Sequence, residues 1–222
     1  SVRDFAESLR PKSRGKPIQF RDYQVDAIWY AIQSNRCLLL SPTASGKSLI
    51  IYTLVRYYNM MGLKTLILVP TTSLVEQMYS DFIDYGWEDK HIHRVYAGMD
   101  KGSKKPVVIS TWQSLYKLHK QYFAQYGCII GDEAHLFKAK SLTDIMTRSE
   151  NCKYRFGLTG TLDGTQTHRL VLEGLFGQVK KIISTKELID RGTLAKLQID
   201  CIVLKHTEEE CKRIRHYRYA EE

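Results

Sequence analysis

The chain has 222 residues, of which 43% are hydrophobic and 26% are charged. These values are close to those of ordinary globular proteins and exclude a disordered chain, a collagen-like repeat and a long coiled coil. Lysine and arginine total 33 against 24 acidic residues, so the formal net charge is +9, which favours a polyanionic partner such as nucleic acid. A merely basic surface is the alternative explanation of the charge.

The length allows one full domain of about 150 residues with a remainder. No segment of roughly 20 apolar residues is long enough to cross a bilayer, and the first residues lack the apolar centre of a signal peptide. The cysteines form no CxxC pair and have no histidine neighbours at zinc spacing. We therefore expect a cytoplasmic protein, without a membrane partner, whose cysteines are reduced core residues: Cys37, Cys128, Cys152, Cys201 and Cys211.

Residues 1–17 are polar and basic, carry Pro11, Gly15 and Pro17, and show no apolar periodicity. We predict that they form a basic N-terminal arm or linker outside the core. From Phe20 onward, short aliphatic runs alternate with segments of helical period, which indicates βαβ units around a mostly parallel sheet.

The aliphatic runs lack polar alternation, as expected for strands that are buried on both faces. The predicted strands are residues 37–40, 65–69, 107–110, 128–130 and 155–159. Two apolar helix faces are predicted between them, one with Val25, Ile28, Trp29 and Ile32, the other with Leu74, Met78, Phe82 and Tyr85. Residues 193–222, with a strand at 197–204 and a capping box at 207–210, are too few to bury a core, so we predict a linker and the truncated start of a second domain.

Residues 41–48, with the sequence SPTASGKS, follow a predicted strand and precede a predicted helix. In such a loop, backbone N–H groups surround phosphates and the helix presents its positive end. Lys47 would reach the β and γ phosphates of a nucleotide, and Ser48 would bind Mg²⁺. An ordinary strand-turn-helix corner stays open, because Ser41 replaces the first glycine of the pattern. The predicted nucleotide-binding residues here are Ser41, Pro42, Thr43, Ala44, Ser45, Gly46, Lys47 and Ser48.

Asp132 and Glu133 follow the predicted strand 128–130. Carboxylates at the carboxyl end of a parallel strand face the crevice in which ligands bind. Asp132 could hold Mg²⁺ and Glu133 could deprotonate an attacking water, whereas a solvated acidic turn is the alternative. We expect Lys47 and this acidic pair to converge from neighbouring strand ends on one cation, and these three residues to be catalytic.

Three motifs resemble, in order and spacing, those of the first RecA-like lobe of superfamily 2 helicases: SPTASGKS, Asp132-Glu-Ala-His135 and Leu158-Thr-Gly-Thr161. FRDYQ at 20–24, LVPTT at 68–72, YAG at 96–98 and STWQSL at 110–115 resemble weaker elements of the same family. The resemblance covers roughly residues 18–205. It implies an α/β fold, a three-layer RecA-like P-loop NTPase domain over residues 18–192, which uses ATP and Mg²⁺.

Within that superfamily, LVPTTSLVEQM, STWQSL and the continuation of the box as HL are similar to the phage UvsW-type recombination helicases, which act on forked DNA. RNA helicases and restriction-type translocases share the same lobe and stay open as alternatives. A phage-encoded protein would work in the host cytoplasm. Ala44 stands where many family members have glycine, so a Cβ would strain a glycine-only backbone angle there.

The resemblance assigns further roles. Arg21 and Gln24 match the element that recognises adenine, and the Gln24 amide suits the N6 and N7 edge of that base, although an exposed helix glutamine is the alternative. His135 with Thr159, Gly160 and Thr161 would link hydrolysis to strand movement. Hydroxyl and backbone groups at strand ends would hold phosphates, with ordinary helix caps as the alternative. The predicted nucleic-acid contacts are Pro70, Thr71, Thr72, Gly98, Ser110, Thr111 and, by stacking on a base unless it is packed, Trp112.

The family's transition-state arginines come from a second RecA-like lobe, whose motifs do not follow residue 161. We therefore expect this chain alone to bind ATP weakly and to hydrolyse it very slowly. The expected function is the ATP-binding lobe of a DNA helicase that acts on branched or forked intermediates. Two other classes stay open, a non-motor nucleic-acid-binding module with a vestigial nucleotide site and a small-molecule kinase.

Overall fold

One parallel sheet organises the chain in the computed structural model, which describes residues 1–162, 166–195, 208 and 210. Its strand order is β5-β6-β4-β7-β8-β3-β9, and every neighbouring pair is parallel. The strands are β3 (Arg36–Leu40), β4 (Lys64–Val69), β5 (Ile92–Val95), β6 (Val107–Thr111), β7 (Tyr126–Gly131), β8 (Tyr154–Thr159) and β9 (Val179–Lys181). The predicted mostly parallel α/β fold is confirmed.

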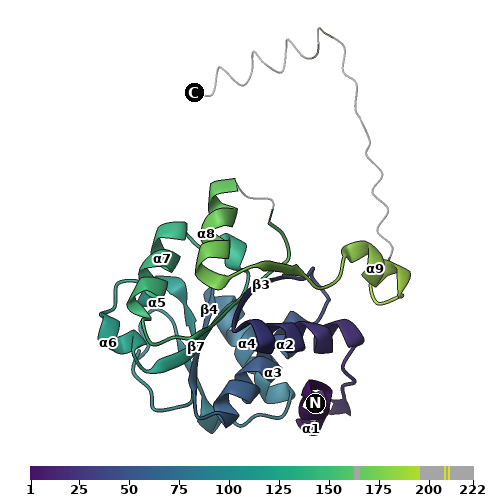
Figure 1. The fold of residues 1–222 in the computed structure, drawn as a ribbon, viewed down its shortest axis with the longest axis horizontal. Helices are drawn as coiled ribbons and strands as arrows, with labels where there is room; N and C mark the ends of the chain where they lie inside the picture. The colour runs from purple at the N-terminus through teal and green to yellow at the C-terminus, as the bar shows by residue number, and fades with distance from the viewer. Residues whose placement is uncertain (163–165, 196–207, 209, 211–222) are drawn as a thin grey trace.

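Helices cover both faces of this sheet (Figure 1). Helices α2, α3 and α4 lie on one face, and α5, α6, α7 and α8 lie on the other. The helices are α1 (Val2–Ser8), α2 (Asp22–Ser34), α3 (Lys47–Met60), α4 (Thr72–Asp84), α5 (Trp112–Leu115), α6 (Lys120–Phe123), α7 (Ala139–Arg148), α8 (Gln166–Phe176) and α9 (Thr185–Asp190), with 3-10 turns η1 (Asp89–His91) and η2 (Ala134–Leu136).

The core divides into two clusters because successive strand side chains point to opposite faces. In β3, Cys37 and Leu39 join the cluster under α2 and α3, whereas Leu38 between them joins the cluster under α7 and α8. All three residues are fully buried. This arrangement confirms the three layers and explains why the central strands are apolar without interruption.

All five predicted strands lie within observed ones, but β5 and β9 were not predicted. Both are short edge strands that carry charged or polar residues, among them Arg94, Lys180 and Lys181. Such residues are typical of sheet edges, where one side of the strand meets solvent. An apolar run therefore marks the centre of this sheet and does not mark its edges.

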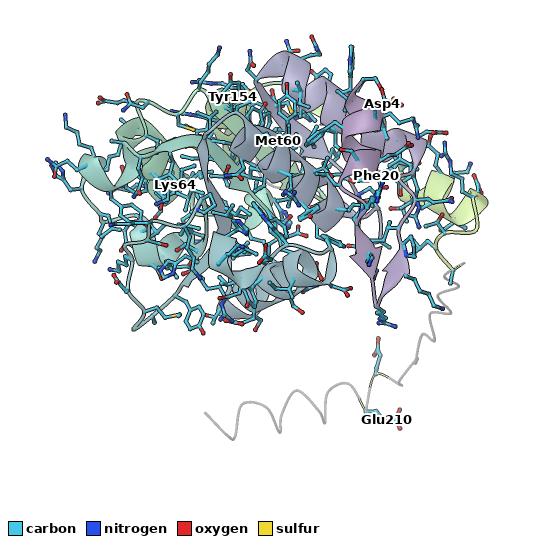
Figure 2. All side chains as sticks on the ribbon, turned by 90° about the horizontal axis from the view of Figure 1, so that it is seen from below. Asp4, Phe20, Met60, Lys64, Tyr154 and Glu210 are labelled. Carbon is cyan, nitrogen blue, oxygen red and sulfur yellow. The ribbon has the colours of Figure 1, made fainter. Side chains whose placement is uncertain are left out.

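The prediction that residues 1–17 lie outside the core is wrong. Val2–Ser8 form α1, in which Ala6 is fully buried, and a two-stranded hairpin follows, with β1 (Lys12–Ser13) and β2 (Lys16–Pro17). A salt bridge of 2.7 Å from Arg3 to Asp22 joins α1 to α2. Figure 2 shows Asp4 of α1 and Phe20 on the same side of the molecule. Val2, Ala6 and Leu9 pack in or against the core, and Phe5 contacts Tyr57 edge to face. These four residues have the spacing of one helix face, a signal that the prediction missed.

Trp29 is also misplaced by the prediction, because 53% of its surface is exposed. The buried face of α2 is centred on Gln24, Ala27, Ile28 and Ala31, and Trp29 lies beyond the edge of that face.

Cys37, Cys128 and Cys152 are buried free thiols, as predicted, whereas Cys201 and Cys211 lie outside the described residues. The predicted strand at 197–204 lies outside them too, as do residues 207 and 209 of the predicted capping box. Among the described residues, no helix has the length and apolar character that a membrane span requires. The domain boundaries after residues 17 and 192 remain predictions.

Gly177 gives a test of the packing between α8 and β3. Its φ is +115°, and a Cβ there would lie 2.6 Å from the carbonyl oxygen of Arg36. We expect Gly177→Ala to lower the free energy of unfolding by about 2 kcal/mol or more.

The matched control is Gly174→Ala inside α8, where a Cβ would meet nothing within 4 Å. It should raise stability by about 0.5–1 kcal/mol, because alanine is the better helix former. Urea unfolding of both variants measures the difference, and equal effects would contradict the packing described.

Candidate functional site

The loop between β3 and α3 is held in a tight conformation by two left-handed residues. Ala44 has a φ of +66° and Gly46 a φ of +82°. Glycine adopts this region freely, whereas the Cβ of Ala44 makes it costly by roughly 1 kcal/mol. The backbone strain that we predicted at Ala44 is therefore present.

Side chains of α2 hold the same loop in place by hydrogen bonds. The hydroxyl of Tyr23 and the Nε2 of Gln24 both donate to the carbonyl oxygen of Ser45, at 3.0 Å each. Within the loop, the Ser41 hydroxyl donates to that of Ser45 at 2.6 Å, and both serines are fully buried. Ser41 thus contributes a hydrogen bond that a glycine in its place could not make.

Gln24 holds the loop with one end of its amide and α2 with the other. Its Oε1 accepts a hydrogen bond of 2.9 Å from the backbone N–H of Arg21, and the Arg21 guanidinium donates to Tyr23 Oη at 2.8 Å. An amide carries two N–H donors and two lone pairs, so each end retains capacity for a ligand. Adenine recognition by Arg21 and Gln24 stays a prediction.

Asp132 and Glu133 lie at the carboxyl end of β7, on the sheet edge that also carries the loop. The backbone N–H of Asp132 donates to the Leu68 carbonyl at 2.9 Å, and that of Glu133 donates to Asp132 Oδ1 at 3.0 Å. Glu133 has a left-handed φ of +49° and forms an ion pair with Lys47. The structure therefore brings the loop lysine and the acidic pair together.

The expectation that neighbouring strands carry these groups is wrong. Strand β8 lies between β3 and β7 and is paired with both. The lysine and the glutamate meet because their side chains reach across the end of β8. At this crossing point a Cβ on Gly160 would lie 3.9 Å from Lys47 Nζ, so a small residue there leaves room for the ion pair.

A cavity of about 370 Å³ opens between the loop, the acidic pair and α4. Burial raises the pKa of Asp132 to about 6; the charge of Lys47 opposes this and that of Glu133 adds to it. Within the described chain, Lys47 is the one cationic side chain of the lining. The lining residues are Thr43, Ala44, Gly46, Lys47, Ser48, Leu74, Gln77, Met78, Asp81, Asp132 and Glu133.

Helix α4 contributes site residues that the sequence did not identify. Asp81 lines the cavity, and the hydroxyl of Tyr85 is 2.7 Å from that of Ser48. Leu74 and Gln77 of the same helix also line this cavity. Their spacing along α4 was the available signal, since residues three and four apart share one helix face.

Thr159 connects the acidic box to the end of β8. Its hydroxyl lies 2.6 Å from Nδ1 of His135 and donates to the Thr161 carbonyl at 2.7 Å. The backbone N–H of Ser41 donates to the Thr159 carbonyl at 2.9 Å, so the same residue touches the phosphate loop. The residues predicted to couple the two sites are therefore in mutual contact.

A second groove, of about 450 Å³, lies at the carboxyl ends of β4 and β6. It gathers five of the seven predicted nucleic-acid contacts with other polar residues. Its lining residues are Pro70, Thr71, Thr72, Tyr96, Ala97, Gly98, Lys101, Thr111, Gln113 and Ser114.

Ser110 and Trp112 do not reach this groove. Ser110 is fully buried and its hydroxyl donates to the Thr111 carbonyl at 2.9 Å. Trp112 is only 7% exposed and packs at an edge-to-face angle against Tyr116. Strand alternation turns Ser110 away from the groove, and the packed tryptophan agrees with the alternative that we left open for it.

The cavity fits a magnesium–triphosphate group. Mg²⁺ prefers oxygen ligands and keeps several waters, and the Ser48 hydroxyl and the carboxylates of Asp132 and Glu133 face one space. Over the described ranges, no three His, Cys, Asp or Glu residues form a metal-binding group by themselves. Phosphate oxygens and waters would therefore have to complete the coordination of the ion.

The amino-acid sequence matches a known protein family and two characterised relatives. The model of the family described as type III restriction enzyme, res subunit, matches residues 17–164. The whole chain is 37% identical to 46% of the ATP-dependent DNA helicase uvsW of Enterobacteria phage T4. Across 88% of its length it is 28% identical to 43% of the DNA 3'-5' translocase XPB2 of Sulfurisphaera tokodaii. The chain thus spans slightly less than half the length of these two proteins.

Solved structures agree with the sequence relatives. The crystal structure of T4 UvsW matches with a TM-score of 0.75 and 38% identity over 84% of this chain and 40% of that one. The helicase domain of Hef from Pyrococcus furiosus matches with a TM-score of 0.63 over 75% of this chain and 39% of that one. At 19% identity, the second match concerns the fold alone.

The raised pKa of Asp132 predicts how stability depends on pH. The ordinary value is 3.8 and the folded value about 6, so between these two pH values the folded chain retains a proton that the unfolded chain has lost. The free energy of unfolding should fall by up to about 3 kcal/mol over this range through Asp132 alone. Asp132→Asn removes this loss, so its stability relative to the original chain should rise as the pH rises. Urea unfolding at pH 4 and 7, without nucleotide or Mg²⁺, measures the difference, and a difference that is the same at both pH values would contradict the prediction.

Proposed function

Because this chain belongs to the family of the type III restriction enzyme res subunit, we propose that it is the ATP-binding lobe of an ATP-dependent nucleic-acid helicase or translocase. Its fold is the RecA-like lobe of superfamily 2 helicases. The observation that carries the proposal is the single cavity in which Lys47, Asp132 and Glu133 meet the Ser48 hydroxyl. A phosphate-binding loop and a pair of acids facing one another are what ATP hydrolysis requires.

The Lys47–Glu133 ion pair is the arrangement of the site before ATP would bind. In it, the exposed fractions are 11% for the lysine side chain and 24% for the glutamate. A triphosphate entering the loop would attract the Lys47 ammonium to its β and γ oxygens and leave the Glu133 carboxylate without its partner. Glu133 would then accept the proton of the attacking water.

Ser48 and Asp132 would hold Mg²⁺, which when bound neutralises phosphate charge. The Asp132 side chain is largely buried and accepts a hydrogen bond from the N–H of Glu133, so its oxygens are fixed in direction. Catalysis by this lobe would rest on such positioning and on charge stabilisation. The cavity contains no arginine from the described residues, which supports the expectation that the chain alone hydrolyses ATP slowly.

The groove at the ends of β4 and β6 is our proposed track for the nucleic-acid backbone. Thr71, Thr72 and Thr111 present hydroxyl groups there beside Lys101, and such groups hold phosphates without distinguishing bases. Thr71 also caps α4, accepting a hydrogen bond from the Leu74 N–H, so its hydroxyl is partly engaged. His135, Thr159, Gly160 and Thr161 would transmit changes at the nucleotide to this track.

We further propose DNA as the partner, in the form of branched or forked recombination and replication intermediates, with a second RecA-like lobe completing the motor. The support is the 37% identity to a phage DNA helicase over the whole chain. A restriction-type DNA translocase is the second candidate, and the family match supports it. A module with a vestigial nucleotide site is less consistent with the intact Lys47–Glu133 pair.

Lys47→Ala is the test of the nucleotide site. The variant loses a charged hydrogen bond to phosphate and leaves Glu133 unpaired facing the triphosphate, so ATP affinity should fall by about 10-fold or more. The control is Lys140→Ala, an exposed lysine on α7. Equilibrium titration with a fluorescent, non-hydrolysable ATP analogue measures both. Unchanged affinity in Lys47→Ala would favour the non-motor module.

Lys101→Ala tests the proposed track. Loss of one phosphate contact should weaken binding of single-stranded DNA uniformly across sequences and reduce the slope of log affinity against log salt by about 1. The control is Lys153→Ala, an exposed lysine just before β8 and so at the opposite edge of the sheet. Fluorescence anisotropy with labelled oligonucleotides at several salt concentrations gives the slope. If the affinity for DNA did not depend on salt, the proposal that this groove binds the nucleic-acid backbone would be wrong.

A further inference from the structure

Ser48, the hydroxyl expected to bind the cation, is already held by a partner distant in sequence. Its Oγ lies 2.7 Å from the hydroxyl oxygen of Tyr85, which follows the last residue of α4. Neither the phosphate-loop pattern nor the acidic box contains a residue with this role. The bond therefore ties the metal-binding position of one helix to a separate helix.

Helix α4 brings this contact next to the cavity, because Ser48 and four residues of the helix line it. Leu74, Gln77, Met78 and Asp81 succeed one another at intervals of one to three residues and all line the cavity. Tyr85 is four residues beyond Asp81 and continues the same face. The backbone N–H of Tyr85 donates to the Asp81 carbonyl at 2.8 Å, so the helical path extends to the tyrosine.

Packing fixes the Tyr85 ring in place. Its centroid lies 5.2 Å from that of Tyr52, a fully buried residue of α3, at an angle of 60°. The hydroxyl is thus carried by a ring that is partly buried between α3 and α4. A rigid ring loses little conformational freedom when its hydroxyl makes a hydrogen bond.

A serine hydroxyl has one proton and two lone pairs, and it rotates freely when it has no partner. A cation requires one lone pair to point toward it. Whichever hydroxyl donates, the bond to Tyr85 fixes this rotation. Asp81 adds a carboxylate to a cavity that already contains Asp132 and Glu133, and a further negative charge there favours a divalent cation.

We infer that Tyr85 and Asp81 of α4 are positioning residues for the divalent cation of the magnesium–nucleotide complex, Tyr85 by orienting Ser48 and Asp81 by its charge. The inference rests on the proposed function, because it concerns the same cavity. It adds to the nucleotide site a helix that begins at Thr72 in the neighbouring groove.

A merely structural role for Tyr85 would affect the whole fold, so the test separates magnesium-dependent binding from magnesium-independent binding. The complete chain is titrated with a fluorescent ADP analogue, once with Mg²⁺ and once with EDTA. In Tyr85→Phe, the affinity measured with Mg²⁺ should fall about 3- to 10-fold, and the affinity in EDTA should not change. Asp81→Asn should likewise lower the affinity measured with Mg²⁺ and leave the affinity in EDTA unchanged.

The matched control is Tyr79→Phe on the same helix. The Tyr79 hydroxyl also makes a side-chain hydrogen bond, of 2.8 Å to Asp89, but it does not line the cavity. This variant should bind the analogue like the original chain under both conditions. Thermal unfolding of each variant without nucleotide shows whether the fold is retained.

Three results would overturn the inference. Tyr85→Phe and Asp81→Asn could both bind the magnesium complex like the original chain, or they could lose equal affinity with Mg²⁺ and with EDTA. In these two cases the original chain still binds nucleotide, so the proposed function stands. If the original chain binds no nucleotide under either condition, the proposed function fails, and the inference fails with it.

Discussion

The ion pair between Lys47 and Glu133 is the interaction on which the rest of the site depends. It joins the phosphate loop after β3 to the acidic box after β7, across the end of β8. A partly buried charge pair is costly to break on one side only, because the remaining charge lacks a partner. In the proposed function, an entering phosphate would replace Glu133 as the partner of the lysine, and this exchange would make the site respond to nucleotide.

The loop and the box both contain backbone or side-chain groups in unfavourable states. Ala44 and Glu133 adopt left-handed conformations, and burial raises the pKa of the Asp132 carboxyl. Residues in such states persist where the surrounding structure holds them, and they concentrate at functional sites. Here the surrounding structure is visible: Tyr23 and Gln24 hold the loop, and the Leu68 carbonyl holds the box.

Helix α4 belongs to both cavities. Thr71 and Thr72 at its beginning line the groove proposed for nucleic acid, whereas Asp81 near its end lines the cavity proposed for nucleotide. This helix of 13 residues therefore runs without interruption from one cavity to the other. The side chains of His135 and Thr159 contact one another, and the Thr159 carbonyl accepts a hydrogen bond from the Ser41 N–H in the loop after β3.

The sequence by itself determined the central strands, the phosphate loop and the acidic box, because each depends on residues close together in the chain. Apolar runs that are buried on both faces and short motifs at strand ends are local properties. The helix α1 and the burial of Ser110 follow from helical spacing and strand alternation, two local patterns that the prediction did not apply there. The edge strands and the exposure of Trp29 were decided by tertiary packing, which local patterns do not record. The same is true of the contact between Ser48 and Tyr85, residues 37 positions apart. Sequence spacing does not predict this contact, since it depends on how α4 packs beside α3, where the Tyr85 ring contacts Tyr52.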